Sequence, residues 1–488
     1  MDLITVSAFS LYLLVVVAIA LVAYQRTQNL GDFVLGGRQL GGPVAALSAG
    51  ASDMSAWLLL GLPGAVYTFG LNQIWLPIGL TVGAYISWRI IAKPLRVYSQ
   101  FANDSLTLPA FLDNRFLDNS GIIRCLLALV TLFFFAFYTA SGLVGGAVLL
   151  QRFNISYTEA LWLGTAIIVA YTFIGGFLAV SWTDFFQGSF MFICLLLVPF
   201  IAVAELGGWS QMAQTIQNTT PEKLKPFQGF NALLFFNLMA WGLGYFGQPH
   251  ILVRFMAVKT LKDITIARRI CVGWMSFSMM GAVLIGIVGV SYFYQKELHP
   301  ESIFILFSQS LFSPWLAGIL FAAILSSIMC AIDSQMLASS SALTEDIYHK
   351  WIHRNAKPKH LMWIGRFAII VIAAVAVYLA RDPESRVIHL VAFAWAGLGS
   401  AFGPAVIGAL YWRRMTAKGA MAGIVVGAFA VIIWHLKIGG IFDLYEIIPG
   451  FFLGTLAMII GSLLDVPPAK EITDQFDEVK AFIKASQK

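Results

Sequence analysis

Apolar stretches long enough to cross a lipid bilayer recur from one end of this 488-residue chain to the other. A helix needs about 18 to 20 apolar residues to cross a hydrocarbon core of roughly 30 Å. Hydropathy windows, divided at Gly, Pro and charge breaks, predict about thirteen such spans. Charged residues make up 11% of the chain and hydrophobic residues 59%, whereas soluble proteins are about 25% charged. The sequence therefore predicts an all-α integral membrane protein.

The first apolar run and the four cysteines place further limits on the chain. The opening segment MDLITVSAFSLYLLVVVAIALVAY lacks a positive amino-terminal region and is too long for a signal sequence, so we expect a retained first span. Cys125, Cys194, Cys271 and Cys330 form no CxxC pair, which argues against a disulfide framework or a zinc site. No cofactor is expected.

The distribution of positive charge predicts the topology. Short cytoplasmic loops carry the excess of Lys and Arg. With the N-terminus outside and the C-terminus in the cytoplasm, about 24 of the 31 Lys and Arg residues fall in inside loops. This placement also accounts for the net charge of +6, so nucleic acid is not an expected partner, whereas membrane lipid is.

The chain divides into a membrane domain over residues 1–465 and a tail over 466–488. In the tail, Ile472, Phe476, Val479 and Ile483 recur at helical spacing, which predicts a short interfacial helix. A tail of this length cannot contain a kinase or receiver domain. A fusion of a transporter with a sensor is therefore not expected.

The second span, ALSAGASDMSAWLLLGLPGAVY over residues 46–67, carries small and polar residues at its centre. Gly50, Ser52, Asp53 and Ser55 stand where a simple anchor would have Leu or Val. A carboxylate at that depth costs about 3 kcal/mol on insertion scales and therefore usually lines a functional cavity. A structural role, with Asp53 hydrogen-bonded between helices, is the alternative.

The seventh span, FFNLMAWGLGYFGQPHILVRF over residues 235–255, has a second break. Gly242, Gly244, Gly247 and Pro249 fall within eight residues, and proline removes one backbone donor. The second span opens one set of five spans and the seventh opens the next, and because five is odd the two sets enter the membrane from opposite sides. This is the arrangement of an inverted repeat with a binding site near the midplane.

Two unwound helices are suited to binding a zwitterion. The N-termini of half-helices offer free N–H groups to a carboxylate, and unwound carbonyls can bind a cation. Trp241 and Tyr245 are four residues apart and, together with Tyr138, could enclose an apolar substrate body. Packing in the core is the alternative role for each of these aromatic side chains.

Several long segments resemble bacterial sodium/proline symporters of the sodium/solute symporter family. They include GGRQLGGPVAALSAGASDMSAWLLLGLPGAVY, FFAFYTASG, YTFIGGFLAVSWTDFFQ, MAWGLGYFGQPHILVRFMA, SSSALTEDIY, FAWAGLGSAFGP and YEIIPGFF. The resemblance extends from about residue 30 to 464. It implies a LeuT-like core of ten helices over residues 41–412, with one helix before it in 1–40 and two after it in 413–465. It also implies that proline is imported with sodium by alternating access, across a bacterial inner membrane.

The resemblance assigns roles to particular residues. For sodium it implies the carbonyls of Ala51 and Met54, together with the positions of Cys330 and Ala331. Ion coupling is implied for Asp53 and Asp184, and a role in a gating loop for Arg38. The positions implied to contact proline are Ser55, Ala56, Tyr138, Trp241, Tyr245, Gln248 and Pro249.

The chain departs from the family pattern at the sodium site. The family usually has a Ser-Thr pair where this chain has Cys330 and Ala331, yet sodium is a hard cation that prefers oxygen ligands. The ion could bind one turn lower, at Ser326 and Ser327, or Asp333 could supply an oxygen. Alternatively, the coupling ion could be a proton, which needs only a buried carboxyl group such as that of Asp53 or Asp333.

Other functional classes fit the sequence less well. The seven histidines form no HExxH or similar metal-binding spacing, so an enzyme is not expected. Within the transporter class, the alternative is another small solute of the same family, such as a short monocarboxylate or pantothenate. The segment GLGYFGQPH, which is close to that of the proline branch, favours proline.

Overall fold

Long helices dominate the computed structural model, which describes all residues except 1–2, 25–29, 119, 175, 230 and 487–488. Within a bilayer, a helix satisfies its backbone N–H and C=O groups internally, so apolar runs of this length fold as helices. The long helices are α1 Leu3–Tyr24, α5 Trp75–Ile90, α8 Ile122–Leu150, α9 Tyr157–Ile174, α10 Phe177–Glu205, α14 Leu261–Tyr292, α16 Pro314–Ser341, α17 Pro358–Leu379, α18 Val387–Tyr411, α19 Ala417–His435 and α20 Ile447–Leu464.

Shorter helices connect or interrupt the long ones. They are α2 Leu30–Leu35, α3 Gly42–Asp53, α4 Leu62–Phe69, α6 Ala92–Phe101, α7 Leu108–Arg115, α11 Trp209–Thr219, α12 Ala232–Met239, α13 Pro249–Ala257, α15 Ile303–Leu311 and α21 Lys470–Ala485. Segments of 3₁₀ or π geometry complete the chain: η1 Gly36–Arg38, η2 Trp57–Gly61, η3 Leu71–Ile74, η4 Gln151–Phe153, η5 Pro221–Leu224, η6 Ala240–Phe246, η7 Pro300–Ser302, η8 Ala342–Ile352 and η9 Gly440–Asp443.

The membrane spans agree with the predicted pattern in kind. Among the described residues, 8 helices are long and apolar enough to cross a membrane, or up to 10 if each of two bent pairs is one span. Three shorter apolar helices, Leu3–Ile19, Tyr157–Ala170 and Ala232–Phe246, lie where the remaining spans were predicted. The molecule is therefore a multi-pass membrane protein, and the count of thirteen spans stays a prediction.

Side-chain caps mark the beginnings of several helices. A Thr or Asn at the N-cap accepts a hydrogen bond from a backbone N–H that has no partner within the helix. The capping residues and the N–H groups that they accept from are Thr107 with Ala110 at 3.1 Å, Asn231 with Leu234 at 2.7 Å, Thr260 with Asp263 at 3.2 Å and Thr416 with Gly419 at 3.2 Å. These local signals set where α7, α12, α14 and α19 begin.

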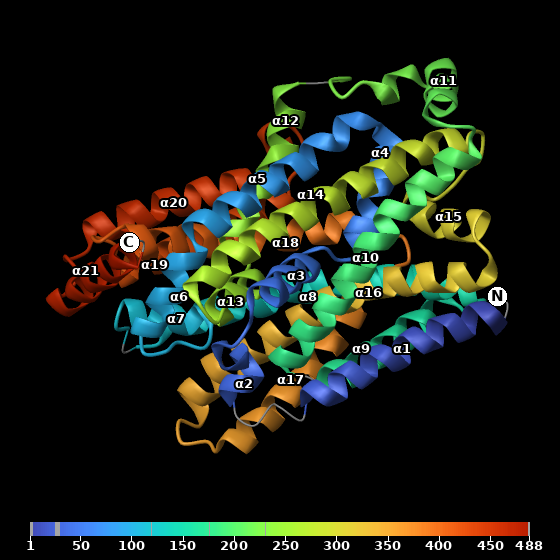
Figure 1. The fold of residues 1–488 in the computed structure, drawn as a ribbon. Coiled ribbons are helices and arrows are strands. Elements are labelled where there is room, and N and C mark those ends of the chain that lie inside the picture. Colours follow the sequence, from blue (N-terminus) through green and yellow to red (C-terminus); the bar gives the residue numbers. More distant parts are fainter. Residues whose placement is uncertain (1–2, 25–29, 119, 175, 230, 487–488) are drawn as a thin grey trace.

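The helices form one bundle, in which α1 and α9 lie at one edge and α19, α20 and α21 at the opposite edge (Figure 1). Small residues allow neighbouring helices to approach closely, which is the usual basis of helix packing in membranes. A Cβ added at Gly281 of α14, for example, would lie 2.6 Å from the carbonyl oxygen of Leu195 in α10. The broken helices α3 and α13 are buried inside this bundle.

Both predicted breaks are confirmed. The second span consists of Gly42–Asp53 and Trp57–Phe69, which are bent by 61° relative to each other. The seventh span consists of α12, the 3₁₀ segment η6 and the nine-residue helix α13, which begins at Pro249. The predicted tail helix is confirmed as α21, a helix of 16 residues.

Candidate functional site

At the first break, the backbone carbonyl of Asp53 accepts hydrogen bonds from outside helix α3. Helix α3 ends at Asp53, and the N–H groups of Met54 and Ser55 donate to the carbonyls of Gly50 and Asp53 at 3.0 and 2.9 Å. The carbonyl of Asp53 also accepts hydrogen bonds from the Trp57 indole at 3.1 Å and from the Tyr138 hydroxyl at 3.3 Å. The small and polar residues of this segment thus leave the chain free to turn, and side chains from α8 and η2 replace the lost helical bonds.

The second break faces the first through a tyrosine. The Tyr245 hydroxyl of η6 donates a hydrogen bond to Oδ2 of Asp53, and both side chains are buried. The other carboxylate oxygen, Oδ1, has no hydrogen-bond partner among the described residues. The two interrupted helices, which are far apart in the sequence, therefore meet at one carboxylate.

Close backbone contacts explain the glycines of the second break. A side chain at Gly244 would collide with the indole of Trp395, and one at Gly247 would collide with the backbone of α18. The side-chain amide of Gln248 donates to the carbonyl of Trp395 at 3.0 Å, and its Oε1 has no partner among the described residues. The glycine-rich sequence thus permits η6 to lie directly against α18.

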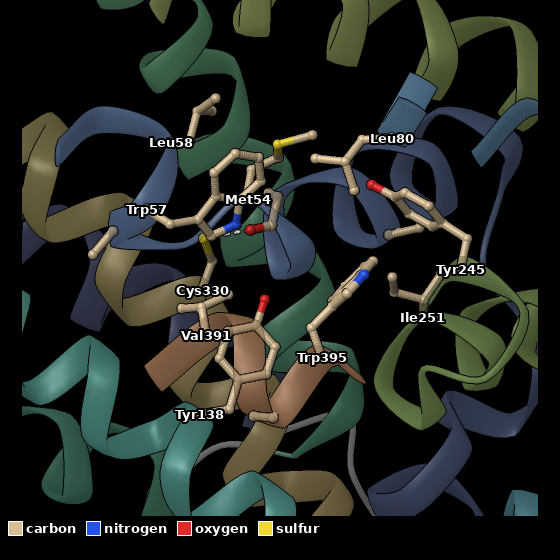
Figure 2. Packing of buried hydrophobic residues seen from close by; sticks show 14 of the residues in the cluster. Met54, Trp57, Leu58, Leu80, Tyr138, Tyr245, Ile251, Cys330, Val391 and Trp395 are labelled. Carbon is tan, nitrogen blue, oxygen red and sulfur yellow. Dashed lines mark hydrogen bonds between the residues drawn. The ribbon is translucent and has the colours of Figure 1, made fainter. Parts of the chain in front are cut away.

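Aromatic side chains surround the two breaks. Figure 2 shows Tyr138, Tyr245, Trp57 and Trp395 around the segment that contains Met54. The ring of Trp241 stacks on Tyr445 with centroids 5.2 Å apart, and Tyr245 meets Trp395 edge to face at 5.1 Å. The predicted aromatic residues are thus brought together. Trp57, Trp395 and Tyr445 were not predicted, although all three lie in segments that resemble the family.

The residues predicted to bind sodium also converge. The thiol of Cys330 in α16 donates to the carbonyl of Ala51 in α3 at 3.0 Å, and the carbonyl of Ser327 lies 3.5 Å from the same sulfur. Met54 and Ala331 are also buried. The thiol therefore engages a carbonyl that was predicted to hold the ion.

The side chains proposed as alternative oxygen ligands of the ion have other hydrogen-bond partners. The hydroxyl of Ser326 is hydrogen-bonded to Tyr12 of α1 at 2.6 Å, and that of Ser327 donates to the carbonyl of Ile324 at 2.7 Å. Asp333 accepts a hydrogen bond from Thr172 of α9 at 2.5 Å, and its Oδ2 has no partner among the described residues. The structure thus directs Ser326 toward α1, away from the break, and leaves one oxygen of Asp333 unpaired.

A buried arginine joins four helices one turn beyond the breaks, toward the predicted cytoplasmic side. The guanidinium of Arg254 in α13 donates to Ser48 of α3 at 3.1 Å, to Asp184 of α10 at 3.2 Å and to Ser334 of α16 at 2.5 Å. Ser48 also donates to Asp184 at 2.7 Å. The sequence pointed to Asp184 but missed Arg254, because one charge at the end of a span does not reveal its partner.

Arg38 fixes the first loop to the ends of two other elements. Its guanidinium pairs with Asp104 at 2.8 Å and donates to the carbonyls of Met256 at 2.7 Å and Ser105 at 2.9 Å. Burial lowers the pKa of Arg38, and the carboxylate of Asp104 opposes that shift. Arg38 therefore ties the first loop to the segment around Asp104 and to the end of α13, and its gating role stays a prediction.

Comparisons with known proteins show sequence similarity over nearly the whole chain. Residues 33–427 match the model of the sodium:solute symporter family. The chain is 46% identical over 481 residues to the sodium/proline symporter of Escherichia coli, with coverage of 97% of this chain and 95% of that protein. It is 47% identical over 461 residues to the high-affinity proline transporter PutP of Bacillus subtilis, with coverage of 93% and 97%.

Solved structures show the fold. A substrate-bound, outward-open Na⁺-coupled sialic acid symporter superposes with a TM-score of 0.82 at 19% identity, with coverage of 96% of this chain and 99% of that one. Mhp1, a nucleobase-cation-symport-1 family transporter, gives a TM-score of 0.56 at 14% identity, with coverage of 93% and 100%. The predicted LeuT-like, all-α transporter fold is therefore confirmed.

Proposed function

This chain belongs to the sodium:solute symporter family, and on that premise we propose that it imports L-proline together with sodium. Its similarity to sodium/proline symporters over nearly the whole chain supports this function. One structural observation carries the proposal, namely that Asp53 and Tyr245 join the two broken helices inside the bundle. Alternating access requires such a site at the junction of the two repeats.

Proline binds between the aromatic side chains and the ends of the half-helices. Its apolar ring packs against Tyr138, Trp241 and Tyr245, which are buried beside the breaks. Helix α13 begins at Pro249, and the positive end of its dipole attracts the substrate carboxylate. Ser55, Ala56 and Gln248 complete the proposed contacts. The unpaired Oε1 of Gln248 and Oδ1 of Asp53 are acceptors suited to the imino group of the substrate.

Sodium is the proposed coupling ion, and it binds between α3 and α16. The carbonyls of Ala51, Met54 and Ser327 are its oxygen ligands, as a hard cation requires. The thiol of Cys330 now donates to Ala51, so it must turn away when the ion enters. Asp333, with one unpaired carboxylate oxygen, supplies compensating negative charge from the same helix. Asp184 contributes through its pair with Arg254.

Proton-driven proline uptake is a second candidate. It is favoured by the loss of both hydroxyls at Cys330 and Ala331, which leaves the shell with fewer hard ligands. Asp53 or Asp333 would then carry the proton. A single charge moving through 100 mV provides about 2.3 kcal/mol with either ion.

The proposed location is the inner membrane of a bacterium, with the N-terminus outside and the C-terminus in the cytoplasm. The excess of Lys and Arg in alternate loops supports this orientation. The relatives are bacterial proteins.

Uptake of labelled solutes into proteoliposomes tests the substrate. Proline, a short monocarboxylate and pantothenate are each offered under the same inward sodium gradient, with protein-free liposomes as the control. We expect saturable uptake of proline alone. Uptake of either other solute without proline uptake would show that the proposed substrate is wrong.

A further inference from the structure

A pocket with three basic side chains lies where the tail helix α21 meets the membrane bundle. Arg89 of α5, Lys93 of α6 and Lys480 of α21 line it together with apolar and aromatic side chains. None of these three cations has an ion-pair or hydrogen-bond partner among the described residues, and none of the described residues that line the pocket is acidic. Three unpaired cations around one pocket create a site for an anion.

The pocket lies at the end of the membrane-spanning helices. Arg89 and Lys93 flank the bend at which α5 ends and α6 begins, and the two helices differ in direction by 42°. The hydroxyl of Tyr411, the last residue of α18, donates to the carbonyl of Ile90 at this bend at 2.5 Å. The positive-inside rule assigns this end of both helices to the cytoplasmic surface. An occupant of the pocket would therefore lie at the level of lipid headgroups.

A buried arginine adds positive charge behind the pocket. Arg115 is fully buried, and its guanidinium lies 5.2 Å from the ring centroids of Tyr98 and Phe476, both of which line the pocket. Its Nη1 and Nη2 have no hydrogen-bond partner among the described residues. A desolvated cation without a carboxylate partner favours an anion nearby. This observation is independent of the three basic residues that line the pocket.

The acidic residue of the tail helix next to Phe476 is paired with a cation outside the pocket lining. Asp477, which follows Phe476, is paired with Arg413, with Nη2 and Oδ2 2.9 Å apart. Phe476, Val479, Lys480 and Ile483, at helical spacing, form the face of α21 that lines the pocket. The tail helix thus presents an apolar face with one cation to the pocket.

Below the pocket, an apolar stripe continues into the membrane. Val82, Tyr85 and Ile86 are exposed on α5 and precede Arg89 by one to two turns. An acyl chain can lie along this stripe while the lipid headgroup binds the cations. A soluble phosphate has no apolar part that would contact the stripe. Basic pockets between spanning helices on the cytoplasmic side are typical binding places for anionic lipid headgroups.

We propose that this pocket is a specific site for an anionic phospholipid, whose phosphate contacts Arg89, Lys93 and Lys480 and whose acyl chain lies along α5. The lipid would join α21 to the end of α5. Because α5 packs against η6, the site connects the lipid to the second broken helix.

Retention of lipid by the purified full-length protein tests the proposal. The protein in mild detergent is incubated with equal amounts of phosphatidylglycerol and phosphatidylcholine, and bound lipid is counted by native mass spectrometry. Each cation near an anionic surface is worth about fivefold in affinity. We therefore expect about fivefold less bound phosphatidylglycerol for K480Q, and a loss of about 100-fold for R89Q/K93Q/K480Q.

Two further variants separate a lost site from a damaged protein. R269Q/K357Q/K359Q removes three exposed basic residues of the same predicted side that do not line the pocket, and it should retain lipid like the wild type. R89K/K93R/K480R keeps the charges and should also retain it. Equal retention by the wild type and R89Q/K93Q/K480Q, or an equal loss in the control, would overturn the proposal. Equally tight binding of soluble glycerol phosphate would overturn the assignment to a lipid.

Discussion

At the residue scale, the hydroxyl of Tyr245 is the most direct test of the site. A hydrogen bond to a charged group contributes about 1.5–3 kcal/mol. We expect Tyr245→Phe, which keeps the ring, to raise the half-saturating proline concentration about 10- to 150-fold. The control is Tyr294→Phe, because Tyr294 is exposed and distant in sequence from the breaks. Unchanged proline affinity in Tyr245→Phe would show that the hydrogen bond between Tyr245 and Asp53 does not contribute to proline binding.

The thiol of Cys330 allows a second test at the same scale. Cys330→Ser places a hard oxygen beside the Ala51 carbonyl, where the thiol now donates. Sodium prefers oxygen to sulfur, so we expect the half-saturating sodium concentration of proline uptake to fall about tenfold, and to fall further in Cys330→Ser/Ala331→Thr. Cys194→Ser changes a buried cysteine of α10 and should have no such effect. Identical sodium dependence in all variants would place the ion elsewhere.

Much of the candidate site could be predicted at this scale, but not its partners. Asp53 was identifiable because a carboxylate in an apolar span is costly, and the structure joins it to Tyr245 as expected from the paired breaks. Trp395 and Tyr445 were missed because an aromatic residue in an apolar span looks the same whether it packs in the core or lines a site. The roles of individual residues remain proposals.

At the scale of elements, the Arg254–Asp184 pair should hold α13 against α10. Removal of one partner of a buried ion pair costs about 3–5 kcal/mol, because the other charge remains uncompensated. We expect Arg254→Gln to lower the thermal stability of the purified protein markedly and the double variant Arg254→Gln/Asp184→Asn to recover part of the loss. The exposed pair Arg413–Asp477 is the control, since such pairs contribute under about 1 kcal/mol. Additive losses in the double variant would show that the two residues act separately.

A second prediction at this scale concerns the close contact between η6 and α18. Gly244→Ala would force the Trp395 indole aside, and overpacking of this kind costs about 1–3 kcal/mol. We expect a loss of proline uptake at an unchanged protein level in the membrane. Gly273→Ala in α14 is the matched control, because a Cβ there meets no atom within 4 Å. Similar uptake by both variants would indicate that η6 does not need the close contact.

The breaks in two helices were predictable because Gly and Pro act locally on the backbone. The π geometry of η2 and η8 was not, since it depends on how neighbouring helices pack and leaves no periodic signal in the sequence. The contact of Ser326 with α1 was missed for the same reason. Sequence spacing identifies the face of a helix on which a hydroxyl lies but does not identify the helix that covers it.

At the scale of the whole molecule, the fold followed from two physical constraints. Apolar length requires spanning helices, and the odd offset of five spans from the first broken span to the second indicates an inverted repeat. The superposition on a Na⁺-coupled symporter agrees with that inference. The coupling ion is less constrained, because a fold does not by itself determine the ligands of an ion site.

Sodium-coupled proline transport is tested most directly by accumulation of labelled proline in proteoliposomes. An inward sodium gradient and an inward proton gradient without sodium are imposed in turn, at the same membrane potential. We predict accumulation above equilibrium with the sodium gradient and none with the proton gradient alone. Accumulation driven by protons in the absence of sodium would contradict sodium coupling.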